Sequence, residues 1–555
     1  MPARIFIGAE FFRELRENNC YYIDKTGLIE ELLSENPAKV SLFTRPRRFG
    51  KTLMMTMLRD FFDIRQDSKA LFEGLAISQN NALCEKWMNQ YPTVFLTLKG
   101  VEGLSFEQAM GQMKNLLSRL CIEFSFLLES SSVDSTDRQT LSELKNLAGT
   151  PDQLANALTT LCSALQAHYG KPAILLIDEY DVPLARAEQN GYYNEMVSFL
   201  RNFLGAAFKT NPSLQLGILT GCLCIARESI FTGLNNFKCC GISDSKFSDK
   251  FGFTAQEVDT LLADTHFSHK KDVMCEWYDG YRFGREQDIY CPWDILQYVD
   301  DLQTDPLALP KAYWSNTSGN SVIRSFIGRT DLGTNSKFEK LLAGESIEVD
   351  LVESLTYDTV YSSEENLWSM LYLTGYLTKA RDESSDDRVR LVIPNKEIRE
   401  IFTKSISQWF KDTVAKSDRT ELFTLFWNAD AAGMTKLLRK ELYKTISYYD
   451  AHEDFYHAFL AGSLSFSGYE VQSNRESGLG RPDILVFDIQ NERAAIIEIK
   501  HASSLPQLYA EAQNALEQIE REKYAEGIPS IFESVIKYGI AFYKKECLVL
   551  ADTLS

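Results

Sequence analysis

The sequence predicts an α/β protein with a parallel sheet in its N-terminal part, a mostly helical middle region and a second, smaller α/β domain at its C-terminal end. Between about residues 39 and 240, short apolar runs alternate with amphipathic segments, which is the pattern of buried parallel strands separated by helices. From about 250 to 425, helical and aromatic patterns dominate. From about 426 onward, two apolar strands joined by a polar turn are followed by a helix and a last strand.

A chain of 555 residues is long enough for several cores, and we place domains at residues 1–245, 246–425 and 426–555. Helical patterns separate the strands of the first domain, for example at 53–62 and 193–208. The strands expected there are AKVSLFT (38–44), TVFLTL (93–98), AILLID (173–178) and QLGILTG (215–221). The last domain combines strands at 484–489, 494–500 and 537–550 with a helix at 508–525.

Composition narrows the class of protein. A net charge of −19 argues against a surface coated with positive potential for nucleic acid, although a local basic groove needs only a few Lys and Arg residues. No run of about 18 apolar residues occurs, so we expect no membrane span, and the first residues lack the features of a secretion signal. Eleven scattered cysteines without zinc-ligand spacing predict reduced thiols in a cytoplasmic protein.

The segment RPRRFGKT (45–52) has the pattern of a phosphate-binding loop, with one departure. Gly50, Lys51 and Thr52 supply the second half of Gly-x-x-x-x-Gly-Lys-Ser/Thr, but Arg45 stands where the first glycine belongs. An expected strand precedes the loop and an expected helix follows it, as such a loop requires. Lys51 would reach the β- and γ-phosphates of ATP, and Thr52 would supply a hydroxyl to Mg²⁺. The side chains expected to add cationic contacts to phosphate are Arg45, Arg47 and Arg48.

Two acids end a later expected strand, as in the acidic partner of such loops. Asp178 would hold Mg²⁺, and Glu179 would orient and polarise the attacking water. Thr220 ends a third strand, where a polar side chain could sense the γ-phosphate. Three strand ends of one parallel sheet therefore indicate a nucleotide site. The alternative is that the arginines form a solvated basic turn and the two acids cap a helix.

The most specific stretch is GRPDILVFDIQNERAAIIEIKHA (480–502). Asp483 opens one expected strand, and Glu498 and Lys500 close the next on one face, because side chains repeat every second residue. Hairpin pairing can bring Asp483 beside them, and two carboxylates with a carbonyl could hold Mg²⁺ or Mn²⁺. Lys500 could orient or deprotonate the attacking water and stabilise the transition state. The alternative is a surface ion pair between Glu498 and Lys500, against which the apolar strands argue.

Other residues could complete this second site. His457 could face the metal or be a packed helix residue, and Gln518 and Tyr524 could lie near a nucleic-acid 5′ end or on an exposed helix. The acids that could join Asp483 and Glu498 are Glu453, Asp454, Glu470 and Glu476, and the sequence does not choose among them.

The order of motifs resembles a bacterial and archaeal family that joins an AAA-ATPase-like P-loop domain to a C-terminal PD-(D/E)XK nuclease-like domain. The resemblance covers nearly the whole chain. Its motifs here are YYIDKTGLI (21–29), RPRRFGKT (45–52), LLIDEYDVPL (175–184), ESIFTGLNNF (228–237), WYDGYRFG (277–284), YCPWDIL (290–296), FYHAFLAG (455–462), RESGLGRPDILV (475–486) and IIEIK (496–500).

This resemblance implies ATP or GTP binding by Lys51, Thr52 and Asp178, and a metal site at Asp483, Glu498 and Lys500. It implies a restriction-endonuclease-like fold for the last domain. An arginine at the first loop position is usual in the family, so Arg45 looks inherited. The family implies no settled substrate.

Three further side chains near the start, Tyr22, Asp24 and Lys25, could contact the base or ribose of the nucleotide. A turn and helix cap explain them equally well. Arg227 or Arg282 could act as a sensor or finger arginine, and a structural ion pair is the alternative for each.

We interpret the chain as a cytoplasmic ATPase and Mg²⁺-dependent nuclease. It would be a hydrolase in which the bound nucleotide controls the metal site. Its partner would be nucleic acid, with DNA favoured over RNA, and self-association is left open. Defence or mobile-element biology fits by analogy only. The alternatives are a nucleotide-switched scaffold with an inactive nuclease fold, to which the acidic charge lends some support, and an ATPase whose last domain only tethers DNA.

Overall fold

A computed structural model of the chain describes most of its residues. The described ranges are 4–34, 38–225, 237–316, 323, 335–381, 388–405, 420–442, 456–457, 460, 464, 469–473 and 482–554. The chain forms two compact units, Met1–Thr317 with Glu348–Arg399, and Ser318–Ile347 with Glu400–Ser555. The division into three domains at residues 245 and 425 stays a prediction.

The first unit contains the parallel sheet that the sequence predicts, and the fold class is confirmed. Its five strands pair in the order β2-β3-β4-β1-β5, and every pair is parallel. The strands are β1 (Val40–Thr44), β2 (Thr93–Thr97), β3 (Ala173–Asp178), β4 (Leu214–Gly221) and β5 (Phe237–Cys240). β1 and β3 are buried along their whole length, as expected for strands covered on both faces.

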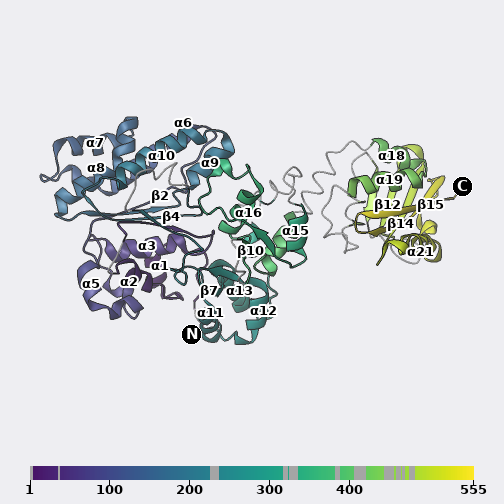
Figure 1. Ribbon diagram of the computed structural model, residues 1–555, viewed down its shortest axis with the longest axis horizontal. Coiled ribbons are helices and arrows are strands. Elements are labelled where there is room, and N and C mark those ends of the chain that lie inside the picture. The colour runs from purple at the N-terminus through teal and green to yellow at the C-terminus, as the bar shows by residue number, and fades with distance from the viewer. Residues whose placement is uncertain are drawn as a thin grey trace. The chain divides into compact units, whose positions relative to one another are not determined.

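Helices cover both faces of this sheet (Figure 1). On one face lie α1 (Phe12–Glu17), α2 (Gly27–Leu32), α3 (Lys51–Phe62), α4 (Lys69–Phe72) and α5 (Asn81–Trp87). On the other lie α6 (Phe106–Glu123), α7 (Ser135–Lys145), α8 (Pro151–Tyr169), α9 (Val182–Asn190) and α10 (Tyr193–Phe208). The ends of α8 follow from its sequence, because Thr150 and Gln153 form a capping box and Gly170 ends the helix in a left-handed conformation.

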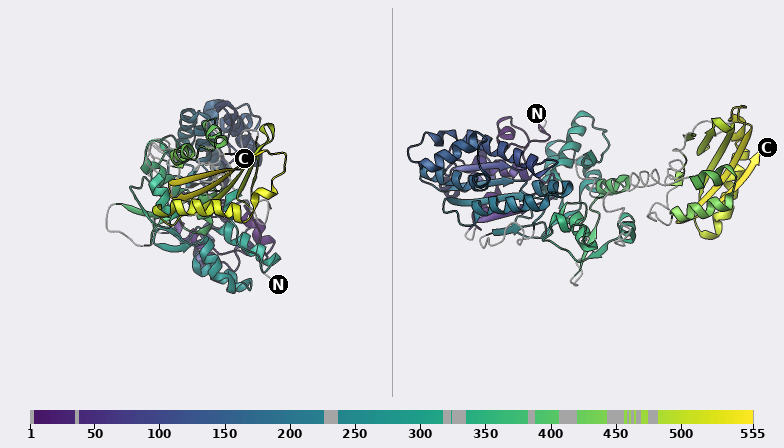
Figure 2. Two further views of the ribbon diagram at one scale, coloured as in Figure 1. Left: turned by 90° about the vertical axis from the view of Figure 1, so that its right-hand side faces the viewer. Right: turned by 90° about the horizontal axis from the view of Figure 1, so that it is seen from above.

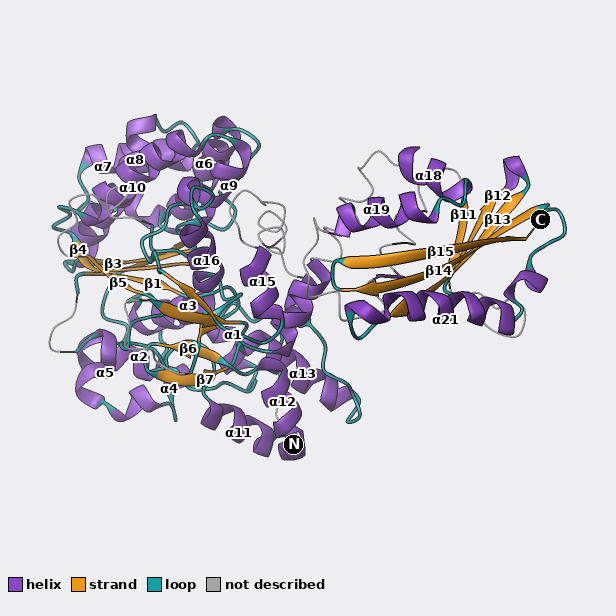
Figure 3. Cartoon of the chain, turned by 45° about the vertical axis from the view of Figure 1, so that its right-hand side comes forward, coloured by secondary structure: helices purple, strands orange, loops and turns teal. Residues whose placement is uncertain are grey.

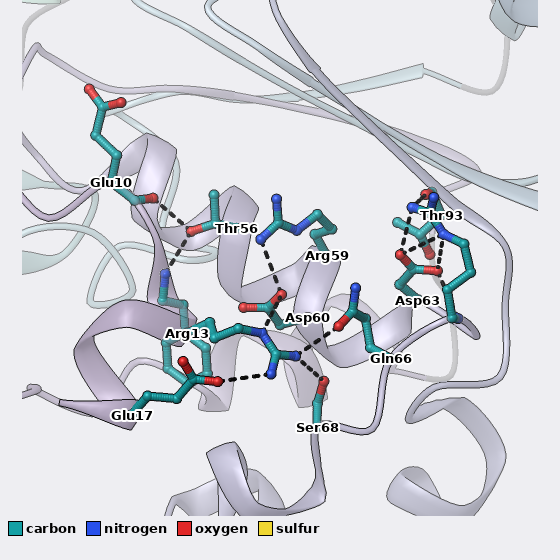
Figure 4. A network of polar contacts seen from close by, with 12 residues as sticks. Glu10, Arg13, Glu17, Thr56, Arg59, Asp60, Asp63, Gln66, Ser68 and Thr93 are labelled. Carbon is teal, nitrogen blue, oxygen red and sulfur yellow. Dashed lines mark hydrogen bonds and ion pairs between the residues drawn. The ribbon is translucent and has the colours of Figure 1, made fainter. Parts of the chain in front are cut away.

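A buried polar network holds α3 against the segment that carries α1 (Figure 4). The Thr56 hydroxyl donates to the Glu10 carbonyl over 2.8 Å and accepts from the Phe12 amide over 3.1 Å. Asp60 is fully buried and pairs with Arg59 at 3.2 Å and Arg13 at 3.9 Å. A buried carboxylate needs such cationic partners. The network therefore fixes the helix whose first residues are the Lys and Thr of the loop.

The middle region is mostly helical, as predicted, and includes two small sheets. Its main helices are α11 (Ala255–Asp264), α12 (Lys271–Tyr278), α13 (Pro292–Thr304) and α16 (Glu364–Leu373). β6 (Tyr281–Phe283) and β7 (Glu286–Ile289) form a hairpin, and β8 (Ile347–Val349), β10 (Val389–Val392) and β9 (Thr378–Lys379) form a three-stranded sheet in that order. Short 3-10 turns include η4 (Tyr313–Asn316) and η6 (Tyr357–Thr359).

The YIDKT segment (22–26) contacts this region, η1 (Ala76–Gln79) and α3. Lys25 Nζ donates to Glu257 on α11 over 2.7 Å and to the Asp249 carbonyl over 2.8 Å. The Asp24 carboxylate accepts from the amide of Thr26 over 2.8 Å and from that of Ala76 over 2.6 Å. Tyr22 donates its hydroxyl to the Met57 sulfur over 3.4 Å. These contacts favour the structural alternative, a turn and helix start, over contact with a nucleotide.

Two carboxyl groups are buried side by side in the middle region. Asp294 on α13 is 2% exposed and Glu397 is fully buried. The Trp314 amide donates to Glu397 Oε1 over 2.8 Å, while Glu397 Oε2 and Asp294 Oδ1 have no hydrogen-bond partner among the described residues. Burial raises the pKa of Glu397 far above its ordinary value, and the charge of Asp294 raises it further. The pair therefore holds a proton that ordinary carboxyl groups have lost at neutral pH.

Glu397→Gln is expected to weaken the pH dependence of stability. The folded pair keeps a proton that the unfolded chain releases above the ordinary glutamate pKa of 4.5, so its contribution to the free energy of unfolding falls as pH rises from that value. A full proton amounts to about 1.4 kcal/mol per pH unit. The glutamine keeps an acceptor for Trp314 and does not titrate. Melting temperatures from mildly acidic to mildly alkaline pH should therefore fall less steeply for the variant, and equal slopes would refute a shared proton.

The second unit contains a mixed sheet in the order β11-β12-β13-β14-β15. β13 and β14 are parallel, and the other neighbours are antiparallel. The strands are β11 (Glu470–Ser473), β12 (Ile484–Asp488), β13 (Arg493–His501), β14 (Ser534–Tyr543) and β15 (Glu546–Leu554). The single last strand predicted at 537–550 was wrong, because the chain turns after Tyr543 and β15 pairs antiparallel with β14. α21 (Leu508–Arg521) connects the two parallel strands and lies beside the sheet (Figure 2, left). This unit also contains α15 (Asn335–Leu342).

α18 (Thr420–Trp427) and α19 (Ala431–Leu442) lie on the face of this sheet opposite α21 (Figure 3). The Tyr538 hydroxyl donates to the Phe426 carbonyl, and Arg439 pairs with Glu546 at 3.0 Å. Helices on both faces of a sheet bury its strands completely, so a charged side chain within β13 is costly unless it has a partner. Among the described residues of the whole chain, no helix has both the length and the apolarity needed to cross a membrane.

Candidate functional sites

The loop between β1 and α3 has the shape that a phosphate site needs. Gly50 has φ 80° and lies directly before the first residue of α3, and Arg48 has φ 69°. A left-handed conformation is easy for glycine and costly for arginine, so the chain holds strain at this turn. The amide groups in the first turn of α3 have no partner within the helix, which makes this helix start suited to an anion.

Lys51 lies inside this loop. Its side chain is buried, and Nζ donates to the carbonyl oxygens of Arg45 over 2.9 Å and Pro46 over 2.8 Å. The sulfur of Cys222 lies 3.9 Å from the same atom. A phosphate offers an ammonium group stronger acceptors than neutral carbonyls do. Lys51 is thus held where the sequence places the phosphates.

Thr52, Asp178 and Thr220 come from three different elements and meet at one carboxylate. Thr52 Oγ1 donates to Asp178 Oδ2 over 2.8 Å, and the Thr220 hydroxyl donates to Asp178 Oδ1. β4 lies between β1 and β3 in the sheet, so the parallel strands end at a common edge. Hydroxyl and carboxylate oxygens are ligands that Mg²⁺ prefers, and the three side chains fit a nucleotide-bound Mg²⁺.

Glu179 follows Asp178 with φ 52°, and its side chain is half-buried. Its amide donates to Thr220 Oγ1 over 3.3 Å. Burial raises the pKa of its carboxyl group, and the positive charges of Lys51 and Arg47 oppose that shift. A carboxylate with a raised pKa at the edge of a nucleotide site is suited to accept a proton from water.

Arg45 requires a correction, because its side chain points away from the loop interior into the core. Its guanidinium is fully buried and donates to the carbonyls of Thr44 and Cys240 over 2.9 Å each and of Phe247 over 3.0 Å. The ring of Phe251 lies 4.7 Å away. Both terminal nitrogens of the guanidinium are bound to carbonyls in the core, so Arg45 supports the loop from behind and phosphate contact is not its role in this structure.

Arg48 and Arg282 also have structural contacts. The Arg48 guanidinium lies 3.8 Å from the centre of the Trp293 ring at the start of α13. Arg282 Nη1 donates to the Ala380 carbonyl over 3.1 Å, which favours the structural alternative for this residue. Arg227 lies outside the described residues. Phosphate contact by Arg48 stays a prediction.

Tyr180 and Asp181 hold the segment after β4, a role that the sequence did not predict. Tyr180 donates its hydroxyl to the Leu223 carbonyl over 2.7 Å, and Asp181 accepts from the amides of Cys222 and Leu223 over 3.0 Å each. A Cβ on Gly221 would lie 2.6 Å from the Tyr180 ring, so only glycine allows this approach. The aromatic residue and second acid in IDEYD were a signal that could have pointed to these contacts.

The second site lies on the hairpin formed by β12 and β13. Ile484 pairs with Ile497, and this register places Asp483 opposite Glu498 at the open end of β12. Asp483 Oδ2 accepts from the Ile499 amide over 2.7 Å. Lys500 Nζ lies 3.0 Å from Glu498 Oε1. The three residues that the sequence singles out are therefore brought together.

Glu498 is the most constrained member of this group. Its side chain is 3% exposed, and burial and the charge of Asp483 raise its pKa to about 7. Gln518 on α21 donates its side-chain amide to Oε1 of Glu498 and to the Tyr524 hydroxyl, the latter over 3.3 Å. Oε2 is buried without a hydrogen-bond partner among the described residues. Gln518 and Tyr524 thus face the site through Glu498, which decides against an exposed-helix role for them.

This group fits a divalent metal ion. The orphaned Glu498 Oε2 and the Asp483 carboxylate are hard oxygen donors at one place, and Mg²⁺ commonly keeps several waters beside one or two carboxylates. The described residues contain no cluster of three or more His, Cys, Asp or Glu side chains placed to hold a metal. Any further ligands would have to be carbonyl groups, water or the substrate.

The strand register excludes one of the candidate acids. Glu470 pairs with Phe487, at the opposite end of β12 from Asp483. Four residues of an extended strand span about 13 Å, too far for a shared metal ion. Glu453, Asp454 and Glu476 lie outside the described residues. His457 Nε2 contacts the Asp483 carbonyl at 2.8 Å, so it supports the backbone of the site.

Gly539→Ala is expected to separate α21 from the sheet. Gly539 pairs with Glu498 in register, and a Cβ there would lie 2.2 Å from the Ala512 carbonyl of α21. Backbone cannot yield as a side chain can, so the helix that carries Gln518 must move. Overpacking of this kind costs about 1–3 kcal/mol. Chemical denaturation would measure the loss.

The matched control for this substitution is Gly205→Ala in α10, where an added Cβ meets nothing within 4 Å. In a helix interior that change should be neutral or stabilising. Equal stability of the two variants would contradict the close approach of α21 to β14.

Comparison with known proteins gives two domain matches. Residues 6–231 match the model of a family described as "Predicted AAA-ATPase", and residues 451–551 match the model of the "PD-(D/E)XK nuclease superfamily". A protein of Azotobacter chroococcum mcd 1, named "Uncharacterized protein in vnfD 5'region", is 23% identical over 551 residues, covering 97% of this chain and 96% of its own.

Two solved structures from Aeropyrum pernix are also similar. Its ORC2 protein, in ADPNP-ADP complexes, is 11% identical with a TM-score of 0.24, and the match covers 72% of this chain and 96% of that one. Its ORC1 protein, in complex with DNA, is 12% identical with a TM-score of 0.22, covering 73% and 93%.

Proposed function

Because this chain carries an AAA-ATPase-like domain at residues 6–231 and a PD-(D/E)XK nuclease superfamily domain at residues 451–551, we propose that it is a nucleotide-controlled nuclease. ATP would bind at Lys51, Thr52 and Asp178, and the β12–β13 hairpin would cleave phosphodiester bonds with a divalent metal. The proposed substrate is nucleic acid, with DNA favoured over RNA. The proposed setting is the cytoplasm, in defence or mobile-element biology.

The observation that carries the proposal is the charged group on the hairpin, whose central carboxylate, Glu498, is buried. Asp483, Glu498 and Lys500 converge in a sheet whose neighbouring side chains are apolar, and two of the four carboxylate oxygens are already bound by N–H donors. Burial of the Glu498 carboxylate costs free energy, which a purely structural ion pair with Lys500 does not recover well. The hairpin retains three charged groups where the fold alone would be better served by apolar ones.

In the proposed cleavage reaction, Asp483 and Glu498 would hold the metal ion, which when bound lowers the pKa of a water molecule and polarises the phosphate. Gln518 holds Oε1 of Glu498 and thereby directs Oε2 toward the metal. Lys500, whose side chain is a quarter exposed, can reach both the attacking water and a phosphate oxygen. Its ammonium would stabilise the negative charge on the phosphoryl oxygens in the transition state.

In the proposed ATPase reaction, Lys51 would leave the carbonyls of Arg45 and Pro46 and pair with the β- and γ-phosphates. Thr52 and Asp178 would hold Mg²⁺, which would neutralise part of the negative charge of the phosphates. Glu179 would orient water at the γ-phosphate, and Thr220 would keep the Asp178 carboxylate in place.

The test is an incubation of the purified protein with supercoiled plasmid, linear duplex, single-stranded DNA and RNA, in Mg²⁺ or Mn²⁺, with and without ATP. We expect metal-dependent cleavage of DNA whose rate changes with ATP. Absence of cleavage under every condition would refute the nuclease. Cleavage at the same rate with and without ATP would refute nucleotide control and leave the nuclease standing.

A second candidate function is a nucleotide-switched scaffold with an inactive nuclease fold. The net charge of −19 favours it, because such a surface repels phosphate backbones and suits a protein partner. If the chain is such a scaffold, it should bind ATP and cleave none of the nucleic acids in the same experiment. Light scattering should then show an oligomeric state that changes with ATP.

A further inference from the structure

A single carboxylate oxygen links the nucleotide edge of the sheet to the middle region. Asp181 lies three residues after Asp178, at the start of α9, and its side chain is 1% exposed. Its Oδ2 accepts three hydrogen bonds of 3.0 Å each, from the Cys222 amide, the Leu223 amide and the Tyr357 hydroxyl. The proposed phosphate and water contacts make no use of this carboxylate.

The two amides belong to the segment that directly follows β4, which we call the post-β4 segment (222–225). Tyr180 holds the other end of it, because its hydroxyl accepts from the Ile225 amide over 3.1 Å and donates to the Leu223 carbonyl. The segment therefore cannot shift without disturbing Tyr180 or Asp181. Both follow directly on Asp178 and Glu179.

The post-β4 segment also contacts the phosphate loop. Cys222 Sγ is 3.9 Å from Lys51 Nζ, and that ammonium is held by two loop carbonyls. A phosphate that takes Lys51 as its partner must change these contacts. Thr220, two residues before Cys222, shares a hydrogen bond with Asp178. The segment thus contacts Lys51 directly, and β4, the strand that leads into it, contacts Asp178.

On its other side, Asp181 reaches the middle region. Tyr357 begins η6, and it and Asp181 belong to the same compact unit. Asp181 Oδ1 has no hydrogen-bond partner among the described residues, so Tyr357 bonds to the oxygen that already takes both amides. A hydrogen bond to a buried, charged group is stronger than one between neutral groups, so the position of Tyr357 is tied to that of the segment.

We propose that Asp181 is a positioning residue that transmits the state of the nucleotide site, through the post-β4 segment and Tyr357, to the middle region around residues 355–361. This inference rests on the proposed nucleotide binding by Lys51. It assigns the coupling to one hydrogen bond, from the Tyr357 hydroxyl to Asp181 Oδ2. The coupling ends within the first unit, so it is testable without nucleic acid.

The experiment is hydrogen exchange measured by mass spectrometry on the full chain, with and without a non-hydrolysable ATP analogue. Three proteins are compared: wild type, Tyr357→Phe and Tyr313→Phe. Tyr313 is the matched control, because its hydroxyl donates to Asp301 over 2.7 Å in the same unit, away from the post-β4 segment, and forms no hydrogen bond to Asp181 among the described residues. Isothermal titration with the analogue establishes binding in each protein first.

We expect the analogue to change exchange at 222–225 and at 355–361 in wild type and in Tyr313→Phe. In Tyr357→Phe the analogue should still change the exchange rates at 222–225. The change in exchange rate at 355–361 should be roughly tenfold smaller than in wild type, because one hydrogen bond to a charged group contributes about that factor. An unaltered response at 355–361 in Tyr357→Phe would overturn the inference, as would no response there in wild type.

If the proposed function is wrong, the experiment gives a different result from the one that overturns the coupling. A wild-type protein that binds no ATP analogue in the titration refutes nucleotide binding, and the coupling with it. Asp181→Asn provides a second variant, since the amide keeps an oxygen acceptor while losing the charge. Its expected result is the loss of the response at 355–361, and a wild-type response in this variant would count against the proposal.

Discussion

Lys500→Ala is expected to abolish metal-dependent cleavage while leaving the fold and ATP binding intact. Lys500 supplies the positive charge 3.0 Å from Glu498 Oε1, and no other Lys or Arg within the described residues forms an ion pair with that carboxylate. Removal of one group that stabilises transition-state charge costs about 100- to 1,000-fold in rate. Initial rates of plasmid cleavage under saturating Mg²⁺ would measure the loss.

The control for this prediction is Arg521→Ala. Arg521 is an exposed basic residue in the same unit, 3.0 Å from Glu522, and exposed pairs of this kind contribute little to stability. Its cleavage rate should match that of wild type. If Lys500→Ala cleaves as fast as Arg521→Ala, the hairpin is not the active site, and the scaffold function becomes the better account of the chain.

Lys51→Ala is expected to weaken ATP binding by roughly 100-fold, because a buried ammonium makes charge-assisted bonds to phosphate. The substitution also leaves the Arg45 and Pro46 carbonyls without their buried donor, so a small fall in melting temperature should accompany it. Titration calorimetry with ATP and Mg²⁺ would measure the affinity. Lys86→Ala, which removes an exposed lysine on α5, is the matched control and should bind as wild type does.

The two lysine variants together separate the two proposed activities. If ATP controls cleavage, Lys51→Ala should cleave at the rate that wild type shows without ATP, and Lys500→Ala should still bind ATP. A Lys51→Ala protein whose cleavage still responds to ATP would show that Lys51 is not the route of control. The comparison needs no assumption about how the two units are arranged.

Much of the geometry of the two candidate sites could be predicted from local patterns in the sequence. Asp178 and Thr220 end apolar strands, and parallel strands end at a common edge, so their meeting with Thr52 could be expected. Glu498 and Lys500 share a face because a strand has a period of two. In the first case the parallel order of the strands determines the neighbours, and in the second the period of one strand does.

Other contacts could not be predicted, and Arg45 shows the reason. An arginine in a phosphate loop suggests contact with phosphate, but the loop turns so that this side chain enters the core and binds the carbonyls of Cys240 and Phe247. The direction of one side chain depends on the left-handed turn at Arg48 and Gly50 and on the strand that lies beside it. Neither is visible in the order of residues.

The sequence by itself determined the fold class, the strand ends that carry acids and hydroxyls, and the pairing of Asp483 with Glu498, because these depend on local periodicity and on a short hairpin. Only the tertiary structure decided that Gln518 holds Glu498, that Glu470 lies at the wrong end of β12, and that Tyr357 reaches Asp181. None of these three follows from the period of one element or from the common edge of parallel strands. They depend on strand register and on how closely Gly539 and Gly221 let their neighbours approach, which are properties of the packed molecule.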